Sequence, residues 1–388
     1  VLGKNLEIFT NDSGLPDILN VKICLIFINE TRNSYYQISK FNSNEFRKEF
    51  YKLYPGNWNF KIADFGDLPS GKRVEDTYFA LSEICNELKK TNTIPVIIGG
   101  SQDLTISLYE SFLKFEKLIN IVSVDNRFDF TQGENLISSR SYMNDIITKS
   151  PNRLNNFTNL GYQTYLIAQE ELDLMDKLFF DSFRLGEVLN DLKITEPVFR
   201  EADIVSFDMK VLNSVTDGTL LKGMPNGLDS RAICAMSRYA GISDRLSVVG
   251  FFDLPDNTFF LKLFSEVLWY FIEGFQCRFD EYPVAISQGF KKYNVSMSDR
   301  EILFYKSIKS GRWWMEMDNK NQLDNKTKSS TLLSCTHQDY LDAWDHVVVK
   351  MANQYKSDLQ FGIPFELGPF LDKQVKSDVT SHKIHYAE

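Results

Sequence analysis

Residues 119–130, "INIVSVDNRFDF", decide the fold class, because an apolar run ends here in a group of charged side chains. The run "INIV" and the residues that follow it are typical of a strand buried in a parallel sheet. Asp125 and Asp129 stand at its end, and Arg127 lies between them. The two aspartates indicate a cation site, but Arg127 is itself a cation. The stretch is therefore either a metal centre or a site in which something has replaced the metal.

Similar apolar runs alternate with helical periodicity along most of the chain. Val74, Tyr78, Leu81, Cys85 and Leu88, for example, have the spacing of one apolar helix face. This alternation predicts an α/β protein with helices on both faces of a parallel sheet. We expect strands at 21–30, 93–100, 119–125, 164–168, 202–209 and 246–252, and helices at 73–91, 103–115 with Asp103 as N-cap, 169–191, 228–240 and 256–274.

Three of the expected strands end in polar residues, at "GGSQD" (99–103), "DNRFD" (125–129) and "SFDMK" (206–210). Ligands of open parallel sheets bind beyond the carboxyl ends of the strands. If the three strands are neighbours, one cleft collects the side chains of Gln102, Asp125, Arg127, Asp129, Asp208 and Lys210.

Composition limits the class of protein. The 388 residues are 43% hydrophobic and carry a net charge of −9, which predicts a sizeable core and argues against a nucleic-acid binder. The sequence contains no run of 18 uncharged apolar residues, so we expect no membrane-spanning helix. The start "VLGKNLEIFTNDSG" lacks a signal-peptide pattern. Five scattered cysteines without a CxxC pair favour a reduced, cytoplasmic protein. All four histidines lie at the C-terminal end, at His337, His346, His382 and His385, so a histidine site in the main body requires the tail to fold back.

The C-terminal part differs from the rest. A polar stretch, 316–331, predicts an exposed loop, and 339–358 predicts a helix. Trp313 and Trp314 are interpreted as core or subunit interface rather than as a ligand platform. We expect a main α/β domain over 1–300 and an extension over 301–388 that packs on the same domain.

The ordered motifs over roughly residues 20–280 resemble the ureohydrolase superfamily of arginase, agmatinase and formimidoylglutamase. The stretches "NLGYQTYLIAQEEL" (159–172), "PNGLDSRAICAMSRYAGISD" (225–244) and "VLWYFIEGF" (267–275) resemble the divergent formimidoylglutamase-like branch of Bacteroidetes. The resemblance implies a three-layer α/β/α sandwich around a central, mostly parallel sheet. It also implies a site that holds two Mn²⁺ ions in active relatives, and a protein that is often oligomeric.

The family pattern is Gly-Gly-x-His, then Asp-x-His-x-Asp, then Ser-x-Asp-x-Asp, then a glutamate near a proline. Asp125, Asp129 and Asp208 match three of its six ligand positions. Gln102 and Arg127 stand where the family has histidines, and Lys210 stands where it has an aspartate. In "VVGFFDLPDN" (248–257), Asp253 lies near the glutamate position.

The replaced ligands suggest that protein cations stand in for the metals. A Mn²⁺ ion at about 4 Å from one fixed cation meets a repulsion of about 8 kcal/mol at an effective dielectric near 20. Arg127 is also able to hold a carboxylate in bidentate fashion. We therefore predict no dinuclear centre, no catalytic residue and no cofactor; if one ion binds, its ligands are Asp125, Asp129 and Asp208.

Three hypotheses remain open. The first is a non-catalytic family member with a binding, regulatory or assembly role, as a homo-oligomer or with a protein partner. The second is a C–N hydrolase of guanidino or formimino compounds with an altered or mononuclear site. The third is a sensor of an acidic small molecule that binds at Arg127 and Lys210.

Overall fold

A single parallel sheet forms the centre of the computed structural model, which describes residues 1–344 except 11, 13, 19, 37–39, 116, 132–136, 221–222, 282–288, 297–300 and 319–329. All strand pairs of this sheet in the described part of the chain run parallel. In spatial order the nine strands are β1 (Leu6–Ile8), β3 (Lys61–Leu68), β2 (Val21–Ile28), β4 (Ile94–Ile98), β9 (Val248–Phe252), β8 (Ile204–Asp208), β5 (Ile119–Val124), β6 (Leu154–Tyr162) and β7 (Asp181–Arg184).

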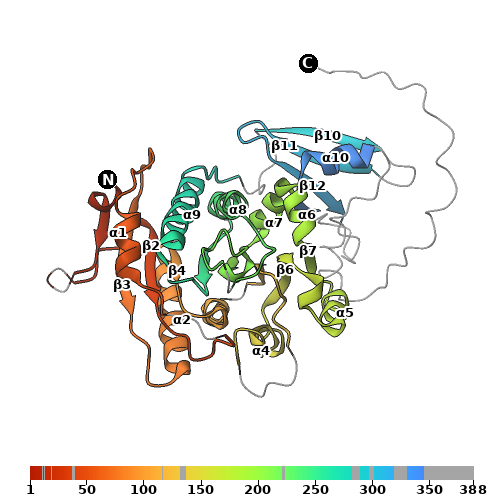
Figure 1. The fold of residues 1–388 in the computed structure, drawn as a ribbon. Coiled ribbons are helices and arrows are strands. Elements are labelled where there is room, and N and C mark those ends of the chain that lie inside the picture. Colours follow the sequence, from red (N-terminus) through yellow and green to blue (C-terminus); the bar gives the residue numbers. More distant parts are fainter. Residues whose placement is uncertain are drawn as a thin grey trace.

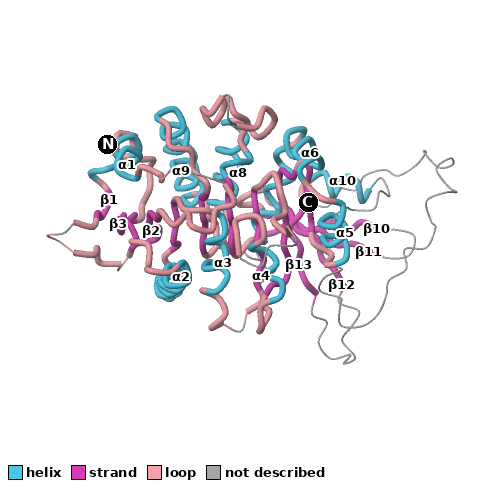
Figure 2. The backbone as a smooth tube through the Cα atoms, turned by 60° about the horizontal axis from the view of Figure 1, so that its bottom comes forward, coloured by secondary structure: helices cyan, strands magenta, loops and turns pink. Residues whose placement is uncertain are grey.

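Helices cover both faces of the sheet, as Figure 2 shows. One face carries α1 (Ser43–Phe50), α6 (Leu185–Asn190), α8 (Ser230–Ile242) and α9 (Thr258–Gln276); the other carries α2 (Val74–Lys90), α3 (Thr105–Glu110) and α4 (Tyr142–Thr148). Each face encloses its own apolar core. The expected three-layer α/β/α sandwich is therefore confirmed, with a wholly parallel central sheet.

Helix α2 illustrates how the apolar period builds these layers. Tyr78, Leu81, Cys85 and Leu88 are buried against the sheet, whereas Phe79 between them is exposed. At the helix start, the Asp76 carboxylate accepts a hydrogen bond from the Arg73 backbone N–H at 2.9 Å. The spacing, the cap and the two lysines of the last turn agree with one another, which explains why the sequence predicts this helix well.

Three sequence expectations are wrong. Residues 164–168 are not a strand: Thr164–Leu166 form a 3₁₀ turn, and the strand β6 precedes them. Residues 169–191 are not one helix, because the short edge strand β7 separates α5 (Gln169–Lys177) from α6. Asp103 is not the N-cap of α3; it lies in a 3₁₀ segment (Gln102–Leu104) and accepts a hydrogen bond from the Tyr78 hydroxyl.

A second, antiparallel sheet follows the main one and is visible beside α10 in Figure 1. Its strands are β10 (Phe290–Ser296), β11 (Glu301–Ser307), β12 (Trp313–Asp318) and β13 (Ser330–Cys335), and α10 (His337–Trp344) follows them. We call strands β10–β13 the small sheet. Parts of the polar stretch 316–331 are thus strand, and its residues 319–329 lie outside the described residues. So do His346, His382, His385 and the end of the expected helix 339–358. The small sheet begins before residue 301, and the division at residue 300 stays a prediction.

Arg200, in α7 (Thr195–Glu201), attaches the small sheet to the main domain. Its guanidinium donates to the backbone oxygens of Trp313 at 3.0 Å and Cys335 at 2.9 Å, and lies 4.8 Å from the Trp314 ring centre. All four residues are buried. Because one buried guanidinium donates hydrogen bonds to the backbone oxygens of both β12 and β13, it holds the small sheet against α7.

Replacing Arg200 with methionine is expected to lower the free energy of unfolding by about 2 kcal/mol, because two buried carbonyl groups lose a charged donor. Urea unfolding followed by tryptophan fluorescence measures the effect. Replacing the exposed Arg231 with methionine is the matched control and is expected to change stability by less than about 0.5 kcal/mol. Equal effects of the two substitutions would contradict the assigned role.

Candidate functional site

Four neighbouring strands bring the predicted site residues to one edge of the main sheet. The strands lie in the order β4, β9, β8 and β5. Phe207 pairs with Val124 and Asp208 with Phe252, so these strands end at similar heights. The side chains that follow, or end, the four strands are those of Gln102, Asp253, Asp208 and Asp125. The structure therefore places these strand ends side by side, as the sequence predicts.

Gly99 and Gly100 allow β4 to end close to β2. Their φ angles are 94° and 72°, in the region that favours glycine. A Cβ atom would lie 2.5 Å from the Ile28 carbonyl oxygen at Gly99 and 2.8 Å from the Glu30 carbonyl oxygen at Gly100. The two glycines thus set the path that brings Gln102 into the site.

Lys210 is the cation inside the group of aspartates. Its ammonium lies 2.5 Å from the Asp253 Oδ1 atom and 4.8 Å from the centre of the Tyr36 ring. Despite burial, the pKa of Lys210 is raised, because the charges of Asp208 and Asp253 stabilise the ammonium. The backbone N–H of Lys210 also donates to the Asp208 carboxylate at 2.8 Å. Lys210 is therefore charged and bound to its neighbours by both its side chain and its backbone.

The aspartates around Lys210 favour their protonated forms. Burial raises the pKa of Asp125, and burial followed by the charge of Asp125 raises the pKa of Asp129 well above its usual range. Burial also raises the pKa of Asp208 well above its usual range, although Lys210 acts in the opposite direction. The carboxyl groups of Asp125 and Asp129 contact each other. One lysine cannot neutralise this many buried carboxylates, so burial and mutual repulsion disfavour the ionised forms of these three aspartates.

Arg127 lies in the wall of the cavity at the strand ends, and its guanidinium does not pair with the aspartates. Its Nη1 atom donates to the Leu166 carbonyl oxygen, and it forms no ion pair with any carboxylate of the described residues. Only its backbone N–H reaches the site, by donating to the Asp125 Oδ1 atom at 3.0 Å. Among the described residues, Arg127 holds no carboxylate in bidentate fashion, so its capacity to bind one stays a prediction. The short turn after β5 places the backbone of residue 127 at the aspartates and its side chain on the wall.

Gln102 belongs to a polar layer beneath the aspartates. Its backbone N–H donates to Asp253 at 3.1 Å, and its side-chain amide donates to the Ser123 hydroxyl at 3.1 Å. Tyr142 is fully buried in the same region, where burial and the charge of Asp129 raise its pKa. The side-chain oxygen of Gln102 is buried and accepts no hydrogen bond from the described residues. Gln102 thus ties β4 to β5 and β9 instead of pointing a ligand atom outward.

Asp129 and Asp253 adopt left-handed backbone conformations, with φ angles of 59° and 54°. This region is unfavourable for residues with a side chain, although aspartate tolerates it better than most. Both residues are nearly fully buried. Two such residues beside one lysine indicate a site whose geometry is held by its surroundings.

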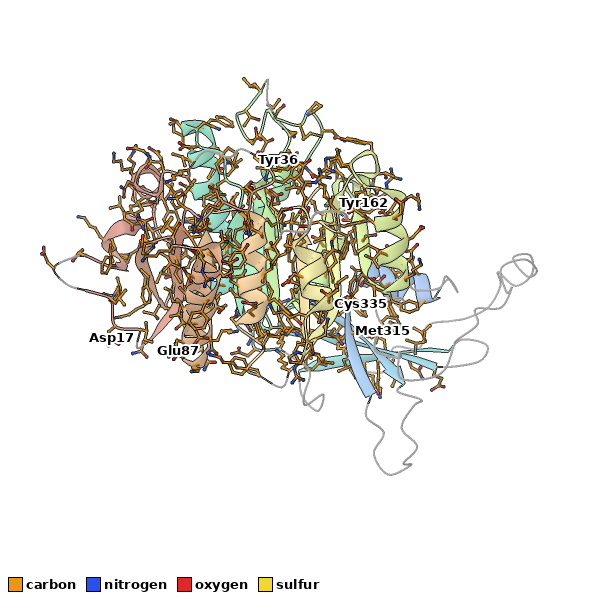
Figure 3. The ribbon with its side chains drawn as sticks, turned by 90° about the horizontal axis from the view of Figure 1, so that it is seen from below. Asp17, Tyr36, Glu87, Tyr162, Met315 and Cys335 are labelled. Atoms are coloured by element: carbon orange, nitrogen blue, oxygen red, sulfur yellow. The ribbon has the colours of Figure 1, made fainter. Side chains whose placement is uncertain are left out.

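A cavity of about 630 Å³ opens at these strand ends. Asp129, Asp208, Lys210 and Asp253 form part of its wall, and Tyr36, marked in Figure 3, lines it from the loop after β2. The volume is within the range of small-molecule sites. The sequence did not single out Tyr36, Arg140 or Tyr142. They come from loops and a helix outside the strand-end motifs, so no spacing rule connects them to the site.

Asp103, next to Gln102, gives the site region a pH dependence. Burial raises its pKa to about 7, although the Tyr78 hydroxyl donates to it. In the unfolded chain the pKa is near 4, so the folded state holds the proton longer. Its contribution to stability is fully present below pH of about 4 and is lost as the pH rises through about 7, by up to about 4 kcal/mol.

Replacing Asp103 with asparagine is therefore expected to flatten the fall in unfolding free energy between pH of about 5 and 8. Urea unfolding of both proteins across this range measures the difference. A variant profile parallel to that of the original protein would contradict the assignment. Asp17, replaced by asparagine, is a surface control for the loss of one carboxylate.

Fold and site together define an α/β protein with a polar cavity at the carboxyl ends of a parallel sheet. The chain belongs to the arginase family, whose sequence profile matches residues 28–251. The predicted ureohydrolase relationship is therefore confirmed, and the Bacteroidetes-type branch stays a prediction. No curated protein sequence matches the chain. In the described part of the chain, no helix is long and apolar enough to cross a membrane.

Solved structures of similar fold include two enzymes named for the formimino substrate. The Trypanosoma cruzi formiminoglutamase with Mn²⁺ has 17% identity and a TM-score of 0.60, over 66% of this chain and 94% of that one. The Bacillus subtilis formimidoylglutamase has 12% identity and a TM-score of 0.62, over 71% and 92%. An agmatine ureohydrolase of Thermoplasma volcanium has 16% identity and a TM-score of 0.54, over 66% and 91%. The TM-scores establish a shared fold, and at these identities they establish nothing beyond it.

The residues at the strand ends do not fit a dinuclear Mn²⁺ centre. Lys210 lies in contact with Asp253, where it would repel a cation. The side-chain amide of Gln102 is turned toward Ser123. Among the described residues, no three His, Cys, Asp or Glu side chains are arranged to hold one ion. No reaction step is therefore assigned to a metal pair here.

Proposed function

We propose that this arginase-family protein is a non-catalytic binding protein, in which Lys210 and shared protons replace the metal ions. The contact of Lys210 with Asp253, at 2.5 Å, carries this proposal. This contact places a fixed positive charge among the aspartate side chains. A lysine cannot activate water as a pair of metal ions does.

The charges support the same conclusion. Asp125, Asp129, Asp208 and Asp253 carry a formal charge of −4 when ionised, and Lys210 contributes +1. Four buried carboxylates without cations would be costly, which agrees with the raised pKa values of three of them. Protons and one lysine give a neutral site without requiring a metal.

The proposal is tested by the metal content and activity of the purified protein. After incubation with Mn²⁺ and desalting, we expect far less than one manganese per chain by elemental analysis. We also expect no release of urea, formamide or ammonia from guanidino or formimino compounds. Near-stoichiometric manganese together with such release would overturn the proposal.

A second candidate is a C–N hydrolase with one metal ion, and one observation favours it. The Oδ2 atoms of Asp125 and Asp129 are buried and make no hydrogen bond to the described residues. Together with Asp208 they are the ligands that the sequence predicts for a single ion, and the three carboxylates would have to move together to hold it, because they are not grouped around one point among the described residues. If this function is correct, replacing Asp208 with asparagine removes both bound metal and hydrolysis. If neither changes, the mononuclear hydrolase is excluded.

The family membership also supports a homo-oligomer or a partner-bound protein in the cytoplasm. Sedimentation of the purified chain tests the first of these roles. If the chain is a monomer at all concentrations, the homo-oligomer is excluded and only the protein-partner proposal is left.

A further inference from the structure

Two arginines line the cavity without a carboxylate partner in the part of the chain that the structure describes. Arg127 and Arg140 both contribute to its wall. Neither side chain forms an ion pair with any of the described residues, and the Nε atom of Arg140 is buried without a hydrogen bond. A partly buried guanidinium with free donors is a site for an oxyanion.

Both guanidinium groups are already held in place. The Leu166 carbonyl oxygen accepts from one nitrogen of Arg127, which leaves its other N–H groups available. The Arg140 guanidinium lies over the Tyr35 ring, 4.5 Å from the ring centre. Less conformational entropy is lost when a ligand binds to side chains that are fixed beforehand.

Glu171 is near the two arginines but does not neutralise them at ion-pair distance. The charges of Arg140 and Arg127 act on its carboxylate, and the backbone N–H groups of Phe130 and Ala168 hydrogen-bond to it. Burial nevertheless raises the pKa of Glu171 overall. The influence of both arginines on one carboxylate places them in the same region of the wall.

The part of the wall formed by Lys210 and Asp208 determines what the rest of the ligand is. Lys210 is charged there and would repel a cationic group. Asp208 lies in the same part of the wall and is buried, so its carboxyl oxygens are available as hydrogen-bond acceptors beside the Lys210 ammonium donor. An uncharged group that donates and accepts hydrogen bonds fits this wall better than a guanidinium or an amidinium.

We infer that the cavity binds a small carboxylic acid with an uncharged, hydrogen-bonding tail. The carboxylate lies on Arg127 and Arg140, and the tail lies beside Lys210 and Asp208. The inference rests on the proposed binding function and specifies its ligand class. It also excludes cationic amidines, because Lys210 occupies the place they would need.

Calorimetric titration of the whole chain in the presence of EDTA tests the inference. The three probes are glutaramate, with a neutral amide tail, γ-guanidinobutyrate, with a cationic tail, and inorganic phosphate. We expect glutaramate to bind at least about tenfold more tightly than either of the others. Tighter binding of γ-guanidinobutyrate, tighter binding of phosphate, or no glutaramate binding at millimolar concentration would overturn it.

Arginine variants locate the carboxylate. Arg127→Gln and Arg140→Gln are each expected to weaken glutaramate binding at least about tenfold, because a charged hydrogen bond is lost. The exposed Arg231→Gln is the matched control and is expected to bind normally. Unchanged affinity in both glutamine variants overturns the inference. If a glutamine variant does not fold, Arg127→Lys or Arg140→Lys replaces it; lysine keeps the charge but not the two-pronged contact, so glutaramate binding is expected to be weaker than in the original chain, and unchanged affinity at both positions overturns the inference. The manganese content of the same samples is measured separately, so failure of the metal-free proposal is distinguishable from failure of the ligand assignment.

Discussion

Replacing Lys210 with methionine is expected to lower the free energy of unfolding at neutral pH by about 3 kcal/mol. Removing one partner of a buried ion pair leaves the other charge without compensation, which typically costs this amount. Asp253, whose side chain is fully buried, is that partner. Urea unfolding followed by circular dichroism measures the loss, provided that the dependence on urea concentration is unchanged.

Two controls separate the ion pair from a general effect of removing a lysine. Lys52 pairs with Glu49 on the surface of the protein, and Lys52→Met is expected to cost less than about 0.5 kcal/mol. The double variant Lys210→Met with Asp253→Asn is expected to recover at least about 1 kcal/mol relative to Lys210→Met alone. If the two changes are simply additive, the pair does not stabilise the site as described.

The largest expected effect is a gain of metal binding in a triple variant. Gln102→His, Arg127→His and Lys210→Asp together supply the ligand types that the resemblance implies for the two Mn²⁺ ions. We expect Mn²⁺ to bind at least about 100-fold more tightly than to the original chain, since a cation at about 4 Å repels Mn²⁺ by several kcal/mol. Calorimetric titration and elemental analysis measure affinity and stoichiometry.

The single variant Gln102→His is the control for this experiment. It adds an imidazole but keeps Lys210 in contact with Asp253, so its Mn²⁺ affinity is expected to stay that of the original chain. If the single variant binds Mn²⁺ as tightly as the triple variant does, Lys210 is not the group that keeps metals out. The proposed replacement of metal by lysine would then be wrong.

The sequence predicts five of the nine strands of the central sheet, β2, β4, β5, β8 and β9, because these strands are almost wholly buried; β1, β3, β6 and β7 were not predicted. β5 (INIVSV) and β8 (IVSFD) are short, mostly apolar and almost wholly buried, which is typical of a parallel strand covered on both faces. The edge strand β7 was missed because "DSFR" is short and only half-buried, which leaves no periodic signal. The turn at Thr164–Leu166 has strand-like residues, but Tyr165 is 65% exposed, so composition gives the wrong prediction there.

At the site, the arrangement of the backbone is predictable from the sequence, whereas the directions of the long side chains are not. Strand ends and a parallel sheet are enough to predict that Gln102, Asp125 and Asp208 lie close together. The direction of a long side chain is not determined by those features. Arg127 donates to Leu166, which comes from a turn after another strand, and Tyr36 reaches Lys210 from the loop after β2. Such contacts depend on the conformations of loops, and loop sequences lack the hydrophobic periodicity that predicts helices and strands.

Strand β8 connects two regions that lie at opposite ends of the molecule. The small sheet is bound at Arg200, just before β8, and the aspartates of the cavity begin at Asp208, where β8 ends. Figure 3 shows Tyr36 at one end and Met315 and Cys335 at the other. All five residues of β8 are buried, and the strand is about 17 Å long. Because β8 is paired with β5 on one side and β9 on the other, it fixes the distance between the residue that binds the small sheet and the aspartates of the cavity.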